Sequence, residues 1–123
     1  MAWGTKTGFT GQTGINNTTE EFLDAVTLNP REICHIQLSV DNEHASTVTD
    51  SLIISVYTTL DASSEVWDSA PFMQMTIKPP TVSAYLVPLT ITGVYKFRIG
   101  GLSSGATNTY AFDGDYRVDG VSA

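Results

Sequence analysis

Apolar and polar residues alternate between positions 32 and 40, in the stretch EICHIQLSV, and this alternation predicts a strand with one buried face. The face expected to be buried carries Cys34, Ile36, Leu38 and Val40. The opposite face carries Ile33, His35, Gln37 and Ser39. The same period recurs in SLIISVYTTL, residues 51–60, after a polar stretch that predicts a loop. We expect these two successive strands to form an antiparallel pair.

Strand character continues along the rest of the chain. Further strands are expected at residues 22–28, 72–77, 83–87, 93–101 and 109–120. Pro79 and Pro80 separate the second and third of these, because proline cannot donate to a β-ladder. Gly114 is expected to mark a bulge or a tight turn in the last one. Without a convincing amphipathic helix, the chain is predicted to be all-β, a single antiparallel β-sandwich of about seven or eight strands.

The first 19 residues differ in composition from the rest of the chain. Glycines stand at positions 4, 8, 11 and 14 among threonine, glutamine and asparagine, and this composition favours an extended or flexible segment. We therefore expect an extended N-terminal arm at residues 1–19 and a β-sandwich domain at residues 20–123. Trp3 and Phe9 are expected to anchor this arm, either on the protein's own body or on a neighbouring molecule.

The charge of the chain limits its partners. Thirteen acidic residues against six basic ones give a net charge of −7, which repels phosphate backbones and anionic lipid. No run approaches the roughly 20 apolar residues of a membrane helix. The N-terminus lacks the basic start and apolar segment of a secretory signal. We expect no nucleic acid partner, no membrane partner, and a chain that stays where it is synthesised.

Residues suited to catalysis are few. The single cysteine, Cys34, lies between apolar neighbours and is interpreted as a small buried hydrophobic residue. His35 is expected on the solvent face of its strand and His44 in a polar loop, so neither is expected to act as a base or a metal ligand. No nucleophile, phosphate-binding or zinc motif is present in the sequence. We expect no catalytic residues, no cofactor, and no enzymatic activity.

Three aspartates near the C-terminus form the best acidic cluster. Asp113, Asp115 and Asp119 in DGDYRVD offer the hard oxygen ligands that calcium prefers. The longer pattern of an EF-hand loop, which ends in glutamate, is absent. Surface acidity, or an ion pair with Arg117, is therefore favoured over a metal site.

Exposed aromatic residues on a β-sandwich would suit carbohydrate binding. The candidates by residue type are Trp67, Tyr57, Tyr85 and Tyr95. Because Tyr85 and Tyr95 alternate with apolar neighbours, core packing is the favoured interpretation for those two.

Four segments together give the chain a resemblance to a family of small virion proteins of tailed bacteriophages. They are WGTKT, VYTTLDASSEVWDSAPF, GVYKFRIGG and DYRVDGVS. The residues that carry the likeness are Val56, Tyr57, Thr59 to Asp61, Ser64, Glu65, Trp67, Asp68, Gly93 to Arg98, Asp115 to Arg117, Asp119 and Gly120. These are strand and turn patterns spread over nearly the whole chain, and they indicate a lineage more than an activity.

The resemblance implies a structural component of the phage particle. The expected role is a capsid decoration, or cement, protein on the outside of the head that binds the major capsid protein. Such proteins are often trimeric, so the resemblance also implies a homo-oligomer on the virion surface, with assembly in the host cytoplasm. A tail, neck or fibre-associated virion protein and a carbohydrate-binding β-sandwich are the alternatives.

Trp67 stands in a polar, acidic stretch between two predicted strands. One interpretation folds this stretch back so that the indole covers the end of the core. The other leaves Trp67 exposed as a contact for a capsid or a glycan. Trp67 therefore joins Trp3 and Phe9 as a candidate assembly contact.

Overall fold

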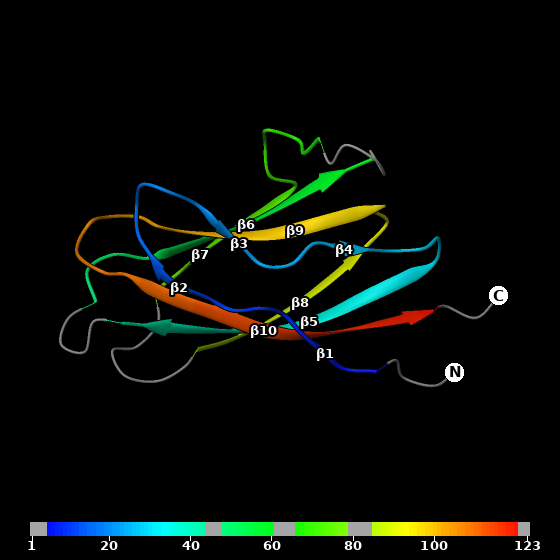
Figure 1. Ribbon diagram of the computed structural model, residues 1–123, viewed down its shortest axis with the longest axis horizontal. Helices are drawn as coiled ribbons and strands as arrows, with labels where there is room; N and C mark the ends of the chain where they lie inside the picture. Colours follow the sequence, from blue (N-terminus) through cyan, green and yellow to red (C-terminus); the bar gives the residue numbers. More distant parts are fainter. Residues whose placement is uncertain (1–4, 44–47, 61–65, 79–84, 121–123) are drawn as a thin grey trace.

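The protein is a β-sandwich of two antiparallel sheets packed face to face (Figure 1). The computed structural model describes residues 5–43, 48–60, 66–78 and 85–120. Within these ranges there are ten strands and no helix, so nothing in them could cross a membrane as a helix. The predicted fold class is confirmed, and the strands beyond the expected seven or eight are short ones in the N-terminal part of the chain.

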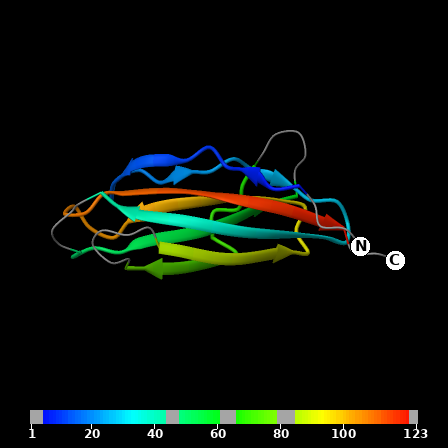
Figure 2. The ribbon, with the colours of Figure 1, turned by 90° about the horizontal axis from the view of Figure 1, so that it is seen from below.

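Sheet A is built around the two longest strands. It has the order β1 (Thr7–Gly8), β10 (Tyr110–Gly120), β5 (Glu32–Asn42) and β8 (Tyr85–Thr92), and β2 (Gln12–Ile15) also pairs with β10. Strands β10 and β5 pair over their whole length of 11 residues. Figure 2 shows β10, β5 and β8 side by side in front, with sheet B behind them.

Sheet B carries the remaining strands. It has the order β3 (Glu21–Phe22), β9 (Lys96–Ser103), β6 (Leu52–Thr59) and β7 (Met73–Ile77), and β4 (Val26–Thr27) also pairs with β9. All of its pairs are antiparallel.

The expected pairing of the first two long strands is wrong. Strand β5 lies in sheet A between β10 and β8, whereas β6 lies in sheet B between β9 and β7. The chain therefore crosses from one sheet to the other between them. Alternation specifies which face of a strand is buried, but both sheets of a sandwich offer such a face, so alternation alone does not specify the partner strand.

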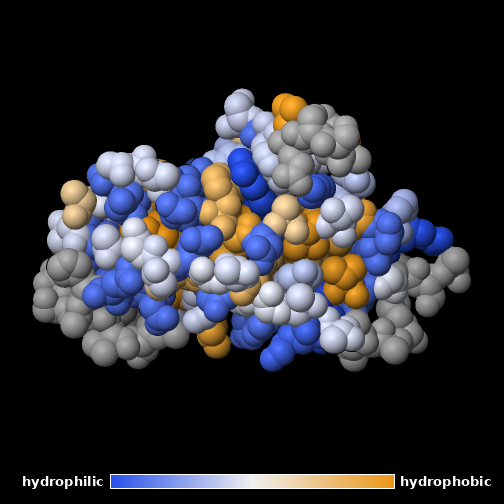
Figure 3. Space-filling view, viewed as in Figure 1, coloured by the Kyte–Doolittle hydropathy of each residue, from blue (hydrophilic) through white to orange (hydrophobic). Residues whose placement is uncertain are grey.

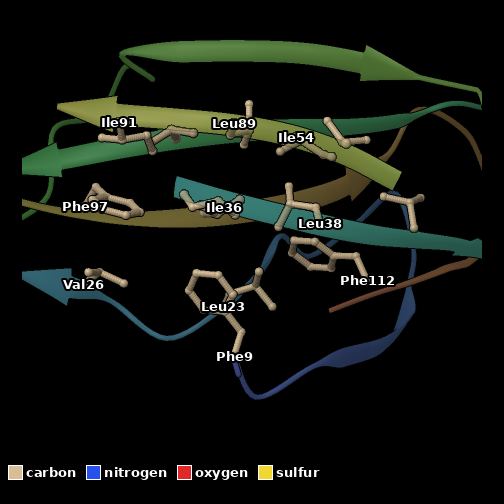
Figure 4. Packing of buried hydrophobic residues seen from close by; sticks show 14 of the residues in the cluster. Phe9, Leu23, Val26, Ile36, Leu38, Ile54, Leu89, Ile91, Phe97 and Phe112 are labelled. Carbon is tan, nitrogen blue, oxygen red and sulfur yellow. The ribbon is translucent and has the colours of Figure 1, made fainter. Parts of the chain in front are cut away.

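The core fills the space between the inner faces of the two sheets (Figure 4). The largest completely buried side chains include Tyr110 and Phe112 from β10 and Phe97 from β9. All four apolar residues of the predicted buried face of β5 are in this core, which confirms the alternation. Cys34 is among them as a free thiol with no exposed surface, as expected for a small buried hydrophobic residue.

The N-terminal segment belongs to the sandwich from Thr7 onwards. Strands β1 and β2 pair with β10, and β3 and β4 then pair with β9, so the segment bridges both sheets along one side of the molecule (Figures 1 and 2). Phe9 is buried, with its ring centroid 4.6 Å from that of Tyr116, and it points into the core near Leu23 (Figure 4). The sequence left open whether Phe9 docks on the protein's own body or on a neighbour, and the structure shows the first of these. Trp3 lies outside the described residues.

The single strand expected at residues 22–28 is two short ones, β3 and β4. Between and beyond them the segment still follows the edge of β9. The backbone N–H of Leu23 donates to the carbonyl of Ile99 at 2.9 Å, and that of Leu28 donates to Tyr95 at 2.8 Å. The side chains of Leu23, Val26 and Leu28 are buried, which ties this segment to the core.

Gly114 marks a close approach between strands, where a bulge or tight turn was expected. The β10–β5 register continues through it without a shift, with Gly114 opposite Leu38. A Cβ atom at this position would lie 2.5 Å from the Gln37 carbonyl oxygen and 3.1 Å from the Leu38 Cα atom. Glycine is required here because the backbone of β5 occupies the space of a side chain.

Asn108, in the connection between β9 and β10, is completely buried and fixes one end of the sandwich. Its side-chain oxygen accepts hydrogen bonds from the backbone N–H groups of Thr49 at 2.8 Å and Asp50 at 2.9 Å. In return, Asp50 Oδ2 accepts from the backbone N–H groups of Thr107 and Asn108, both at 2.8 Å. The Tyr110 hydroxyl donates to the Asp50 carbonyl. These hydrogen bonds hold together two loops that are far apart in the sequence.

Candidate functional site

Three side chains meet on the outer face of sheet B. The guanidinium carbon of Arg98, on β9, lies 3.7 Å from the centroid of the Phe22 ring and 4.7 Å from that of the Trp67 ring. Both distances are within the range of cation–π attraction. Tyr57, on β6, stands directly opposite Arg98 in the register, and its ring centroid is 5.8 Å from that of Phe22 in an edge-on arrangement. We call Phe22, Tyr57, Trp67 and Arg98 the aromatic surface.

Gly100 makes room for this cluster. A Cβ atom there would lie 2.8 Å from Cε1 of Phe22 and 2.6 Å from Oε2 of Glu20. Since β3 pairs Phe22 with Gly100, the Phe22 ring lies on β9 beside Arg98 only because residue 100 has no side chain.

Glu20 orients Tyr57 within the aromatic surface. The Tyr57 hydroxyl is within hydrogen-bond distance of both carboxylate oxygens of Glu20, at 2.9 and 3.2 Å. Burial raises the pKa of Tyr57, and the Glu20 carboxylate raises that pKa further. Tyr57 therefore stays protonated at neutral pH and acts as a hydrogen-bond donor.

Trp67 is held in place by its neighbours in the chain. The Thr59 hydroxyl donates to the carbonyl of Val66 at 2.6 Å, and the backbone N–H of Asp68 donates to the carbonyl of Thr58 at 3.1 Å. These bonds fold the segment back along the end of β6. Trp67 is half-buried and packs against Arg98 on the outer face of sheet B. One interpretation of the sequence placed the indole over the end of the core, and the structure does not place it there.

Three exposed apolar side chains flank Trp67 along the chain. Leu60 is 90% exposed, Val66 67% and Phe72 49%. In Figure 3, apolar atoms protrude at the upper edge of the molecule, above the sheet B strands of Figure 1. We call Leu60, Val66 and Phe72 the apolar rim. Exposed apolar side chains of this size are poorly solvated by water.

The aspartate cluster of the C-terminal strand lies on the other sheet. Asp119 is almost completely buried, and its Oδ2 accepts from Arg117 Nε at 3.1 Å and lies 3.4 Å from His35 Nε2. This confirms the expected ion pair with Arg117. Asp113 and Asp115 are exposed. Among the described residues, no three histidine, cysteine or acidic side chains are arranged to hold a metal ion.

A groove of about 310 Å³ lies beside this ion pair. Its lining mixes both signs of charge: Lys6 and Arg117 against Asp115. His44, the other histidine, lies outside the described residues.

Sequence reasoning missed several members of the site on sheet B. Phe22 and Arg98 were assigned only to strands, because their contact depends on the pairing of β3 with β9, which alternation does not reveal. Tyr85 was expected in the core but is 45% exposed, because it begins β8 at the end of sheet A. Tyr95 is half-buried. A signal in the sequence was available, since Arg98 lies between two buried residues of one strand and must face outwards.

The sequence matches no protein-family model and no curated protein.

Proposed function

We propose that this protein is a structural component of a bacteriophage particle, a capsid decoration protein that binds the outside of the head without catalysis. Its partner is the major capsid protein, and it works as a homo-oligomer, in our proposal a trimer, on the surface of the virion. Two lines of argument support the proposal: the resemblance of four sequence segments to small virion proteins, and the contact chemistry of sheet B.

The observation that carries the proposal is the apolar rim beside the aromatic surface. A chain of this size can bury only a limited number of apolar groups. Leu60 and Val66 are not among the buried ones and expose most of their side chains. Tryptophan, tyrosine and arginine, the residues that dominate binding energy at protein interfaces, adjoin this rim in Trp67, Tyr57 and Arg98. A surface of this composition is typical of a site covered by another protein.

A decoration protein acts by adding contacts that exist only in the assembled shell. Each contact that forms on the head and not on free coat subunits raises the work needed to separate those subunits. When several copies of the contact are linked, as in an oligomer, attachment of one increases the effective concentration of the next. The acidic net charge of −7 would keep decorated heads apart in solution.

Carbohydrate binding fits the aromatic surface less well. A sugar stacks on the open face of an aromatic ring, and in Phe22 and Trp67 the guanidinium of Arg98 already occupies one of the two faces. A glycan array in which the protein binds at micromolar concentration would favour this alternative. Copy number distinguishes a decoration protein from a tail, neck or fibre protein. A decoration protein is present in hundreds of copies, and a tail component in a few dozen at most.

The test is retention on heads. Val66→Asp places a charge on the apolar rim, where the exposed side chain allows the fold to persist. Thr90→Asp places the same charge on β8 in sheet A and serves as the matched control. Purified heads incubated with each protein should retain wild type and Thr90→Asp equally, and Val66→Asp at least about tenfold less. Equal retention of all three would overturn the proposed contact surface.

A further inference from the structure

Arg98 carries a positive charge on the outer face of sheet B. No ion pair involving it forms among the described residues, although the sequence contains 13 acidic residues. Its Nε atom is buried and makes no hydrogen bond. Natural proteins rarely leave a buried donor without a hydrogen bond, so the position of the Arg98 Nε atom is unusual.

The carboxylate of Glu20, beside the aromatic surface, is already engaged. Both oxygens of Glu20 lie within hydrogen-bond distance of the Tyr57 hydroxyl. Glu20 therefore makes the electrostatic potential near Arg98 more negative, but among the described residues it does not form an ion pair with Arg98. The aromatic rings of Phe22 and Trp67 hold the guanidinium instead, and they fix its plane while excluding water from its faces.

A guanidinium held in this way is prepared to bind an anion. A guanidinium is a planar fork of N–H donors that matches a carboxylate, and a charge-assisted pair is stronger where water is excluded. Little side-chain entropy is lost on binding because the side chain is already immobilised by two rings. The adjoining apolar rim offers a place for the apolar part of the same ligand.

We propose that Arg98 receives a carboxylate of the partner protein, and that an apolar side chain next to that carboxylate packs on Leu60 and Val66. This inference rests on the proposed function, since it names the chemistry of the partner at the same surface. An acidic side chain beside a leucine, isoleucine or phenylalanine is the expected partner segment. The net charge of −7 disfavours a highly charged phosphate polymer at this site, but a single carboxylate flanked by apolar groups brings little added repulsion.

The experiment uses small probes and the whole protein. The sequence contains two tryptophans, so Trp3→Phe leaves Trp67 as the one indole whose N–H resonance reports on the site. The probes are N-acetyl-leucine, which has a carboxylate and an apolar group; N-acetyl-leucinamide, which lacks the charge; acetate, which lacks the apolar group; and inorganic phosphate. N-acetyl-leucine should shift the Trp67 resonance saturably, and it should bind at least about tenfold tighter than the amide and than acetate.

Variants of Arg98 then identify the receiving group. In Arg98→Gln, binding of N-acetyl-leucine should fall at least about tenfold, and Arg98→Lys, which keeps the charge but loses the fork, should bind with intermediate strength. Arg31→Gln removes the same charge from an exposed turn and should bind as the parent does. The backbone resonances of each variant report whether it is folded. If Arg98→Gln does not fold, the binding of N-acetyl-leucine to Arg98→Lys tests the role of Arg98.

Three results would overturn the inference. They are equal binding of N-acetyl-leucine and its amide, unchanged binding in Arg98→Lys and Arg98→Gln, and inorganic phosphate binding more tightly than N-acetyl-leucine. The probes test the site in the isolated protein, so their failure is distinct from a failure of the protein to bind heads.

Discussion

Arg98 and Phe22 are in direct contact, with the guanidinium carbon 3.7 Å from the centroid of the ring, although they come from strands at opposite ends of the sequence. The contact holds a positive charge on the outer face of sheet B by attraction to an aromatic ring. It exists because β3 pairs with β9 and because Gly100 leaves space for the ring. In our proposal, a charge placed in this way contributes little to folding and serves to bind the partner protein.

Replacing Arg98 by methionine should therefore separate stability from binding. Methionine keeps most of the apolar contact with Phe22 and Trp67 and removes a buried Nε that makes no hydrogen bond. Urea denaturation should give a free energy of unfolding within about 1 kcal/mol of wild type, while retention on heads is lost. A loss of several kcal/mol in Arg98→Met, with Arg31→Met unchanged, would show that the cluster is mainly structural.

Gly114→Ala should destabilise the sandwich. The added Cβ would meet the backbone of β5, 2.5 Å from the Gln37 carbonyl oxygen, and backbone moves less readily than a side chain. We expect a loss of about 1–3 kcal/mol in the free energy of unfolding, measured in urea. Gly120→Ala, in the same strand, meets nothing within 4 Å and is the control. Equal stability of the two variants would contradict the close approach.

Asn108→Ala should be among the more damaging single substitutions. It removes the acceptor of the Thr49 and Asp50 backbone N–H groups, and little water can replace that acceptor because Asn108 is completely buried. We expect a loss of about 2–4 kcal/mol, seen as a lower Tm. Thr107→Ala, an exposed neighbour in the same loop, should change stability by less than about 0.5 kcal/mol.

Phe9→Ala tests whether the N-terminal segment is part of the folded core. The Phe9 ring is 6% exposed and packs against Tyr116. We expect a loss of about 3–5 kcal/mol together with faster hydrogen exchange of the β1 and β2 amides. Thr13→Ala, at an exposed position of β2, is the control. An unchanged free energy of unfolding in Phe9→Ala would mean that the segment is held loosely.

Cys34 should make stability depend on alkaline pH. Burial, with a smaller contribution from the charge of Asp119, raises the pKa of the thiol from an ordinary value of 9.0 to about 12. Above pH 9 the thiol ionises in the unfolded chain but not in the folded one, so its contribution to stability is complete below pH 9 and is lost as the pH rises towards 12.

Cys34→Ala removes this contribution and isolates it from the other groups. The pKa values of Tyr57 and Tyr110 are also raised, so the comparison is between the two proteins at each pH. The free energy of unfolding of wild type should fall more steeply between pH 9 and pH 11 than that of Cys34→Ala. Parallel curves, or rapid reaction of the native thiol with a disulfide reagent at pH 8, would argue against a buried, protonated Cys34.

The sequence predicted what depends on local pattern. Alternation located β5, β6, β9 and β10 and the apolar residues that they bury, because a period of two is a property of each strand alone. It did not predict that β5 and β6 belong to different sheets, since strand partners are chosen by packing of the whole domain. Composition predicted an extended arm but left open whether Phe9 docks on the protein's own body, where the structure buries it. Glycine content reports backbone freedom and not the docking of one large side chain.

The candidate site was predictable only in part. Trp67 was singled out because a tryptophan in a polar stretch is unusual, but its contact with Arg98 requires the fold of residues 66–68 along β6. Phe22 gave no local signal at all. Contacts between residues distant in sequence are set by topology, and the aromatic surface consists of such contacts.

The most direct test of the central claim is a cryo-electron reconstruction of the particle that carries this protein. We predict hundreds of copies over the head, each with the outer face of sheet B against the coat, with Trp67 and Arg98 covered and Val66 in contact with a coat subunit. A few copies confined to a tail or a single vertex, or copies on the head with sheet B facing solvent, would contradict the account.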